Sequence, residues 1–348
     1  MKQIFTIIAV LLLLNSTASA QNKYWTWVGY SDTRNWDEFF QEITDVGLTG
    51  IIMSAGRESL EKVIPIAQKY GVDVHAWLWI MNNGGIAASH PEWLDYNQKG
   101  ESMRDSMAYV GYYKFLNPAI AEARRAIADG VADVAKTKGL QGISMDYCRY
   151  VDAILPEALW GSYGIIQDKV YPKWDYGYHP EMIAQFTKKY GYDPRDLADP
   201  TQDTLWLDFR CQVLNQFVDS LSTIVHSAGK ELSASPFPTP AMSKQMVRQD
   251  WGRWPLDRAF PMIYHGFYYG GVDWIAQCVR ECRQTMNPNG ELYLGLYIPD
   301  FGNPKGPTIT QAVQAGLDNG AKGIAMYTYD NLSKEQKEEL KKVIQKNK

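Results

Sequence analysis

Short apolar and aromatic runs alternate with amphipathic helical stretches along almost the whole chain. The strand-like runs cover Tyr24–Val28, Gly50–Ser54, Val72–Ile80, Gly142–Asp146, Glu231–Ser235, Ala259–Tyr264, Glu291–Ile298 and Gly323–Tyr329. Helical patterns lie between them, at Arg57–Tyr70, Ala119–Lys138, Thr204–Ala228 and Ser333–Lys346, where Ser333 and Gln336 fit a capping box. Eight such units predict an α/β fold consisting of a single (β/α)8 TIM barrel.

The first residues have the features of a secretory signal peptide. Lys2 precedes an apolar run from Ile4 to Leu14, and the small residues Ala18-Ser19-Ala20 follow. A membrane span needs about 20 apolar residues, and this run is shorter. We therefore expect residues 1–20 to be removed after Ala20, without membrane insertion afterwards, and the protein to reach the periplasm or the extracellular space. Residues 21–348 are then the barrel domain.

Composition excludes some partners and favours another. The formal net charge is −4 with acids and bases interspersed, so no basic face for nucleic acid is expected. The four cysteines are poorly spaced for a disulfide framework, and we expect buried free thiols. The 12 Trp and 22 Tyr suit a surface that stacks on sugar rings, which predicts a carbohydrate partner. The sequence leaves the oligomeric state open.

Alternation within the strands predicts which side chains enter the barrel. In the third strand, Val74, Ala76 and Leu78 form the row facing the helices, whereas His75, Trp77 and Trp79 lie in the inner row. The same rule sends Ile143 and Met145 outward and Ser144 and Asp146 inward. Asp146 therefore points into the barrel at the carboxyl end of its strand, where barrel enzymes place their catalytic groups. A structural alternative is a buried ion pair between Asp146 and Arg149.

Acids expected at the carboxyl ends of the strands are the candidates for catalysis. They are Asp32, Glu58, Asp146, Asp250, Asp300 and Asp330. Asp250 has Trp251 and Trp254 nearby, and apolar surroundings would raise its pKa enough for a general acid. Asp300 follows the seventh strand and ranks just behind it. The structural alternative for both is a turn or helix-capping aspartate.

Aromatic and polar residues near the same strand ends are the expected substrate contacts. We predict that His75, Trp77, Trp79, Arg149, Trp251, Tyr264, His265 and Tyr297 bind substrate. No metal-ligand spacing occurs among the histidines, so we predict neither a metal nor another cofactor. A long loop between Tyr147 and Pro180 is rich in aromatic residues, and we expect it to form a wall of the cleft or a small satellite core.

Several motifs together resemble the glycosyl-hydrolase-like family ten. They are VHAWLWI, SHPEWL, FLNP, GISMDYCRY, WLDFR, QDWGRW and FPMIY, and they span about Tyr24 to Tyr329. The resemblance implies a (β/α)8 barrel, an exported bacterial protein and glycoside hydrolysis, with some relatives acting on peptidoglycan glycan strands. It marks His75, Trp77, Asp146, Arg149, Asp208, Arg210, Asp250, Trp251, Met262 and Tyr264. The chain departs from the family pattern at Cys148, where an aliphatic residue is expected. Asp-Tyr-Cys at the end of the fourth strand is also similar to the nucleophile strand of α-galactosidase-type barrels.

The sequence thus predicts an exported glycoside hydrolase that cleaves a polysaccharide or a bacterial cell-wall glycan. Asp146 would be the nucleophile or base, held ionised by Arg149, and Asp250, or failing that Asp300, would be the general acid. A barrel that binds glycan without cleaving it is the main alternative. A metal-dependent deacetylase or amidase is a third.

Overall fold

A computed structural model describes residues 23–106 and 108–348. The predicted signal peptide, residues 1–20, lies outside the described residues. The strands are β1 (Lys23–Gly29), β2 (Gly50–Ser54), β3 (Asp73–Trp79), β4 (Gly142–Asp146), β5 (Glu231–Ala234), β6 (Arg258–Ala259), β7 (Glu291–Leu292), β8 (Leu294–Tyr297) and β9 (Gly323–Tyr327). They pair in the order β7-β6-β5-β4-β3-β2-β1-β9-β8, and every pairing is parallel. The nine strands form a nearly closed barrel, which confirms the predicted fold.

The seventh predicted strand is interrupted. Only Tyr293 separates β7 from β8. β7 pairs with β6 and β8 pairs with β9, so β7 and β8 together occupy the position of one barrel strand. The sixth strand is also shorter than predicted. Pro261 has no N–H to donate, and beyond β6 the pairing continues only as a bridge between Met262 and Gly295.

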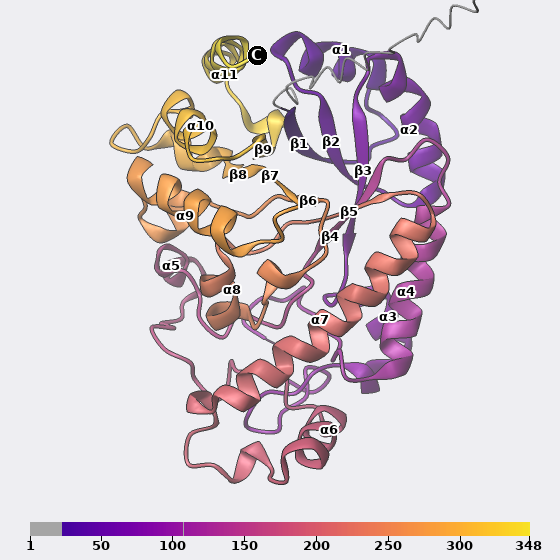
Figure 1. Ribbon diagram of the computed structural model, residues 1–348, viewed down its shortest axis with the longest axis vertical. Coiled ribbons are helices and arrows are strands. Elements are labelled where there is room, and N and C mark those ends of the chain that lie inside the picture. Colours follow the sequence, from indigo (N-terminus) through magenta and orange to yellow (C-terminus); the bar gives the residue numbers. More distant parts are fainter. Residues whose placement is uncertain (1–22, 107) are drawn as a thin grey trace, which may run out of the picture.

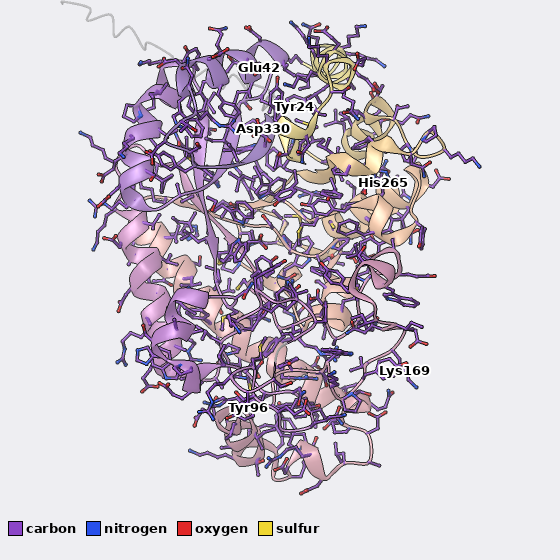
Figure 2. All side chains as sticks on the ribbon, turned by 180° about the vertical axis from the view of Figure 1, so that it is seen from behind. Tyr24, Glu42, Tyr96, Lys169, His265 and Asp330 are labelled. Atoms are coloured by element: carbon purple, nitrogen blue, oxygen red, sulfur yellow. The ribbon has the colours of Figure 1, made fainter. Side chains whose placement is uncertain are left out.

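Helices surround the barrel (Figure 1). They are α1 (Trp36–Val46), α2 (Arg57–Lys69), α3 (Gly84–Ser89), α4 (Ala121–Ala135), α5 (Trp160–Tyr163), α6 (Pro180–Tyr190), α7 (Thr204–Ser227), α8 (Pro240–Val247), α9 (Val272–Thr285), α10 (Ile309–Asp318) and α11 (Lys334–Lys346). The predicted capping box of Ser333 and Gln336 begins α11. Figure 2, seen from behind, shows side chains filling the space between the helices and the strands.

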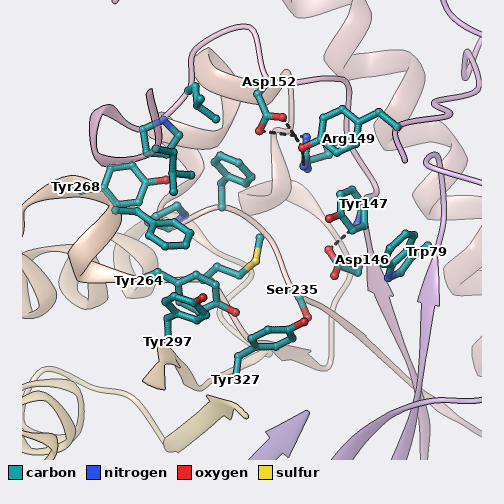
Figure 3. Close-up of a pocket in the computed structure, with 18 of the residues that line it drawn as sticks. Trp79, Asp146, Tyr147, Arg149, Asp152, Ser235, Tyr264, Tyr268, Tyr297 and Tyr327 are labelled. Carbon is teal, nitrogen blue, oxygen red and sulfur yellow. Dashed lines mark hydrogen bonds and ion pairs between the residues drawn. The ribbon is translucent and has the colours of Figure 1, made fainter. Parts of the chain in front are cut away.

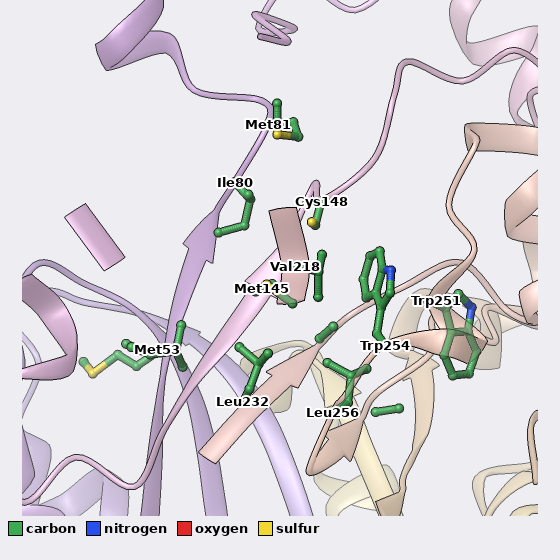
Figure 4. Packing of buried hydrophobic residues seen from close by; sticks show 14 of the residues in the cluster. Met53, Ile80, Met81, Met145, Cys148, Val218, Leu232, Trp251, Trp254 and Leu256 are labelled. Carbon is green, nitrogen blue, oxygen red and sulfur yellow. The ribbon is translucent and has the colours of Figure 1, made fainter. Parts of the chain in front are cut away.

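The two predicted rows of side chains are present. Inside the barrel, an aromatic-rich cluster contains Trp25, Trp27, Ile52, Phe260, Tyr293 and Ala325, with Trp77 and Tyr327 packed against it. Outside, Met145 and Leu232 belong to the large core between the strands and the helices (Figure 4). Because successive side chains of a strand alternate between its faces, this arrangement sends Asp146 inward.

Glycine makes room for the largest inner side chains. A Cβ at Gly50 would lie 2.3 Å from the ring of Trp25, and Gly50 is the residue directly opposite Trp25 between β1 and β2. Likewise, a Cβ at Gly142 would lie 2.6 Å from His75, its neighbour between β3 and β4. Each bulky ring therefore occupies the space that a side chain on the adjacent strand would fill.

Charged residues close the amino-terminal end of the barrel. Arg258 contacts Glu231 at 3.0 Å and Glu291 at 3.4 Å, and its guanidinium lies over the ring of Trp25. His75 is fully buried, with Nε2 3.2 Å from Glu231 Oε2. Burial lowers the pKa of His75 despite this carboxylate, which favours the neutral imidazole. His75 thus lies in the inner row as predicted, but this network holds it away from the residues that line the cavity at the opposite end.

Candidate active site

A cavity of about 470 Å³ lies at the carboxyl end of the barrel (Figure 3). Its lining is mainly aromatic, with Trp27, Trp77, Trp79, Tyr109, Tyr112, Tyr113, Tyr147, Tyr163, Tyr264, Tyr268, Tyr297 and Tyr327. The polar side chains are Asp146, Arg149, Asp152 and Ser235. A mostly apolar wall with a few polar groups is typical of a site that binds a small molecule or a sugar unit.

Asp146 ends β4, is largely buried and lines the cavity. Oδ2 accepts a hydrogen bond from Trp77 Nε1 at 2.9 Å, and Oδ1 accepts one from the N–H of Tyr147 at 2.6 Å. Tyr147 has a φ of 48°, an unusual conformation for a bulky residue and one that turns the chain sharply after the strand. Burial raises the pKa of Asp146, while the two hydrogen bonds and the charge of Arg149 oppose that rise.

Arg149 forms its ion pair with Asp152 rather than with Asp146. Its Nη1 lies 3.4 Å from Asp152 Oδ1, and its Nη2 donates to the hydroxyl of Tyr113 at 3.3 Å. Asp152 also accepts hydrogen bonds from the hydroxyls of Tyr109 at 2.7 Å and Tyr113 at 2.8 Å. The direct pairing considered for Asp146 is therefore absent, because the turn at Tyr147 carries Arg149 toward the next acid along the chain. Arg149 acts on Asp146 only through its charge.

Asp250 is placed away from the cavity. It precedes the short 3-10 helix η5 (Trp251–Arg253), and its Oδ2 lies 3.0 Å from Arg253 Nε. Trp251 is buried in the outer core and donates from Nε1 to the carbonyl of Phe237 at 3.2 Å (Figure 4). The aromatic neighbours that suggested an acid in an apolar pocket are packing residues, and neither Asp250 nor Trp251 lines the cavity.

Asp300 lies behind one wall of the cavity. It sits in the 3-10 helix η7 (Ile298–Gly302), and its Oδ2 accepts a hydrogen bond from the N–H of Gly266 at 2.8 Å. Burial raises the pKa of Asp300 to about 6. His265 is buried beside it, with Nδ1 3.7 Å from Asp300 Oδ2, and does not line the cavity. The wall in front of this pair is formed by Tyr264 and Phe267.

Two groups of rings form the aromatic lining. Tyr264, Tyr297 and Tyr327 pack on one another with ring centroids 5.4 to 6.5 Å apart. Trp79 and Tyr147, with centroids 4.6 Å apart, lie on the other side of the opening in Figure 3. The structure thus brings Trp77, Trp79, Tyr264 and Tyr297 to the cavity together with Asp146 and Arg149.

Several lining residues that the sequence analysis did not select come from the loops after the third and fourth strands. Tyr109, Tyr112 and Tyr113 follow β3, in the tyrosine-rich segment AYVGYY, and Asp152 follows β4. The clustering of tyrosines after a strand is the signal that could have identified the first three. Ser235, which follows β5, also lines the cavity, and its buried Oγ has no hydrogen-bond partner among the described residues.

The segment after β4, where a long aromatic loop was predicted, is irregular over most of its length. It contains the 3-10 helix η2 (Glu157–Leu159) and α5. Tyr150, Tyr176 and Tyr178 are buried in the main core, whereas Tyr163 lines the cavity. Tyr150, Tyr176 and Tyr178 therefore stabilise the core and are not available for sugar stacking.

Among residues 23–106 and 108–348, no group of three or more His, Cys, Asp and Glu side chains could hold a metal ion. All four cysteines, Cys148, Cys211, Cys278 and Cys282, are free and buried, as predicted.

In the part of the chain that the structure describes, no helix is both long enough and apolar enough to cross a bilayer.

Residues 23–156 match the family described as Glycosyl hydrolase-like 10, which confirms the resemblance over the part of the chain that carries the first four motifs. A search of curated protein sequences finds no match.

Solved structures with the same fold include several sugar-processing proteins. The PgaB (BpsB) glycoside hydrolase domain from Bordetella bronchiseptica superposes with a TM-score of 0.68 at 14% identity, covering 93% of this chain and 99% of that domain. A β-galactosidase from the psychrophilic Marinomonas ef1 gives 0.62 at 14% identity, with 93% and 59% covered. The C-terminal domain of a putative chitinase from Desulfitobacterium hafniense DCB-2 gives 0.55 at 9% identity, with 94% and 99% covered. At these identities the similarity establishes the barrel fold.

Proposed function

We propose that this protein is an exported glycoside hydrolase acting on a polysaccharide or a bacterial cell-wall glycan. The proposal starts from the match of residues 23–156 to glycosyl hydrolase-like family 10. The single observation that carries the proposal is Asp146, a carboxylate at the carboxyl end of β4 that faces an aromatic cavity. The glycan-processing structures of the same fold support a carbohydrate substrate.

Asp146 is proposed as the nucleophile or the general base. Both roles require the ionised carboxylate, and the N–H groups of Trp77 and Tyr147 stabilise that form by donating to its two oxygens. Their positions also fix the orientation of the carboxylate before substrate binds. Ser235 also lines the cavity, but its Oγ is buried in this structure.

Asp300 is the better of the two predicted acids for donating a proton. Its raised pKa of about 6 leaves a protonated fraction near neutral pH, whereas Asp250 is paired with Arg253 outside the cavity. Tyr264 lies near both Asp146 and Asp300. Burial raises the pKa of Tyr264 most, and the charges of these two carboxylates raise it further. Proton transfer from Asp300 would require a water molecule or a movement of the Tyr264–Phe267 wall.

The decisive experiment compares wild type with Asp146→Asn on a panel of glycans. The panel contains peptide-free peptidoglycan strands, chitin oligosaccharides, and aryl galactosides and fucosides. We expect wild type to cleave at least one substrate and Asp146→Asn to lose that activity. Asp330→Asn is the matched control, because Asp330 lies after β9 at the same end of the barrel but is exposed and paired with Arg34. Equal turnover by wild type and Asp146→Asn would refute the proposal.

A barrel that binds glycan without cleaving it is the second candidate. The observation in its favour is that Asp152, the other carboxylate lining the cavity, is held by Arg149, Tyr109 and Tyr113 and is not free for chemistry. This candidate predicts that wild type retains a glycan of the panel without releasing products. Product release that depends on Asp146 would exclude it.

Export is proposed from residues 1–20. The protein would be found in the periplasm or the medium, with a mature chain beginning at Gln21. Amino-terminal sequencing of protein recovered from each fraction tests this directly. A chain that keeps Met1 and remains in the cytoplasm would contradict it.

A further inference from the structure

Three large rings of the cavity lining are exposed to an unusual degree, and the two most exposed, Trp79 and Tyr112, lie next to each other. Trp79 is 41% exposed and Tyr112 is 52% exposed, although both line the cavity. Leaving apolar area in water forgoes roughly 25 cal/mol per Å² of burial. Exposed apolar surface at the rim of a site is typical of a surface that a ligand covers.

Trp79 and Tyr112 both contact Tyr147. The centroid of Trp79 lies 4.6 Å from that of Tyr147 and 5.8 Å from that of Tyr112. The hydroxyls of Tyr112 and Tyr147 are 3.0 Å apart and hydrogen-bonded. Trp79 and Tyr112 thus form a fixed surface, and a sugar ring stacking on it would lose little additional side-chain freedom on binding.

The same tyrosine contacts the proposed catalytic carboxylate. Its N–H donates to Asp146 Oδ1 at 2.6 Å, and its left-handed backbone conformation directs this N–H back toward the strand end while the ring extends to the mouth. Figure 3 shows Trp79 and Tyr147 on the side of the opening where Asp146 lies. A group bound on Trp79 would therefore be next to the group that Asp146 faces.

We propose that Trp79 and Tyr112 form an outer stacking subsite for a second sugar ring of the glycan whose neighbouring unit occupies the cavity, and that Tyr147 positions both the subsite and Asp146. The inference rests on the proposed function and narrows it: the substrate is a chain of several sugar units rather than a single terminal sugar with a small leaving group. Stacking on an aromatic face tolerates different sugars, so the subsite selects for chain length.

Substrates of different length test the subsite. For peptide-free peptidoglycan strands of eight sugar units, we expect Trp79→Ala to lower kcat/KM about tenfold, mostly through KM. For an aryl glycoside that wild type also cleaves, which is too short to reach the mouth, the same variant should stay within about twofold. Tyr269→Ala is the matched control, because Tyr269 is 71% exposed but does not line the cavity. An equal loss on both substrates, or no loss on the strands, would overturn the subsite.

Tyr147→Phe tests the positioning role separately. It retains the ring and the backbone N–H but removes the hydroxyl that holds Tyr112. We expect KM for the long strands to rise two- to fivefold, while kcat and the pH profile stay as in wild type. A change in kcat on the aryl glycoside, with KM for the strands unaltered, would show that the hydroxyl serves the chemistry instead.

The subsite can be tested even if the proposed function fails. If wild type cleaves no glycan of the panel, retention of the eight-unit strands on immobilised wild type and Trp79→Ala decides the question. Weaker retention by Trp79→Ala alone supports the subsite in a binding protein. Equal retention by both proteins removes it.

Discussion

At the amino-terminal end of the barrel, Arg258 lies among the carboxylates of Glu231 and Glu291, and His75 is buried against Glu231. At the carboxyl end, Asp146 faces a cavity with two N–H donors and no cation in direct contact. Both ends use side chains of the same inner rows, yet one end pairs its charges and the other leaves a carboxylate facing open space. The charged side chains at the amino-terminal end close the barrel, whereas the carboxylate of Asp146 at the carboxyl end is available to a ligand.

The pKa values of the two ends move in opposite directions. Burial raises the pKa of Glu231, but contact with His75 and the charge of Arg258 outweigh it, so the pKa is lowered overall. Burial prevails for Asp146 and Asp300, whose pKa values are raised. A carboxyl group with a raised pKa destabilises the folded protein when it is ionised. Such groups are concentrated at functional sites.

The largest expected effect is a difference in kcat between variants at the two ends of the barrel. Asp146→Asn should lower kcat on the cleaved glycan about a thousandfold, because the base or nucleophile is removed while its shape is kept. Glu231→Gln, an equivalent change at the closed end, should keep kcat within about twofold when measured on folded protein. Steady-state kinetics on both variants checks this. A thousandfold loss in Glu231→Gln would abolish the distinction between the ends.

The next effect concerns stability. Arg258→Met should lower the free energy of unfolding by about 2 kcal/mol, because it leaves Glu231 and Glu291 without their cation in a partly buried site. Arg253→Met is the control and should change it by less than about 0.5 kcal/mol, since the Arg253 side chain is 77% exposed. Urea unfolding measures both. Equal values for the two variants would mean that the charge network adds nothing to stability.

The pH dependence of stability should have opposite signs at the two ends. With its pKa raised from 3.8 to about 6, Asp300 favours the folded state most below pH 3.8, and that contribution is lost as pH rises through about 6. Asp300→Asn should therefore gain about 2 kcal/mol relative to wild type between pH 4 and pH 7. Glu231, with its pKa lowered from 4.5, contributes above that pH, so the deficit of Glu231→Gln should shrink as pH falls below 4.5.

Thermal unfolding at several pH values measures both trends. If both variants follow the same trend with pH, the assignment of opposite electrostatics to the two ends is wrong.

The smallest effect is a single hydroxyl at the closed end. Tyr293 donates to Glu291 Oε2 at 2.8 Å, and Tyr293→Phe should cost about 1 kcal/mol of unfolding free energy without altering kcat. Tyr171→Phe is the control, because its hydrogen bond to Asp168 is exposed, and we expect no measurable change. A change in kcat for Tyr293→Phe would indicate that the two ends are coupled.

The fold could be predicted from the sequence because its signal is repeated. Alternation within β3 and β4 places Trp77 and Asp146 in the inner row, and an error in one strand is corrected by the others. The interruption at Tyr293 and the short β6 could not be predicted with the same rule. They depend on the missing N–H of Pro261 and on pairing with both neighbouring strands.

The site was less predictable because its contacts depend on loop conformation. Whether Arg149 meets Asp146 or Asp152 is decided by the left-handed turn at Tyr147, and no residue pattern predicts a tyrosine in that conformation. For Asp250, the sequence pattern indicated a pocket that the structure does not have at that position. Its aromatic neighbours looked like the lining of a pocket, but Trp251 is buried in the outer core.

The pairing of Trp25 with Gly50, and of His75 with Gly142, has a consequence for how the strands align during folding. A shift of β2 by two residues along β1 would keep the inner faces matched but would place the buried side chain of Ile52 against Trp25. The misaligned barrel would have to expand or expel the indole ring. Gly50 and Gly142 therefore favour one register of the neighbouring strands, because only glycine leaves room for the opposite ring. These positions lie far from the loops that line the cavity.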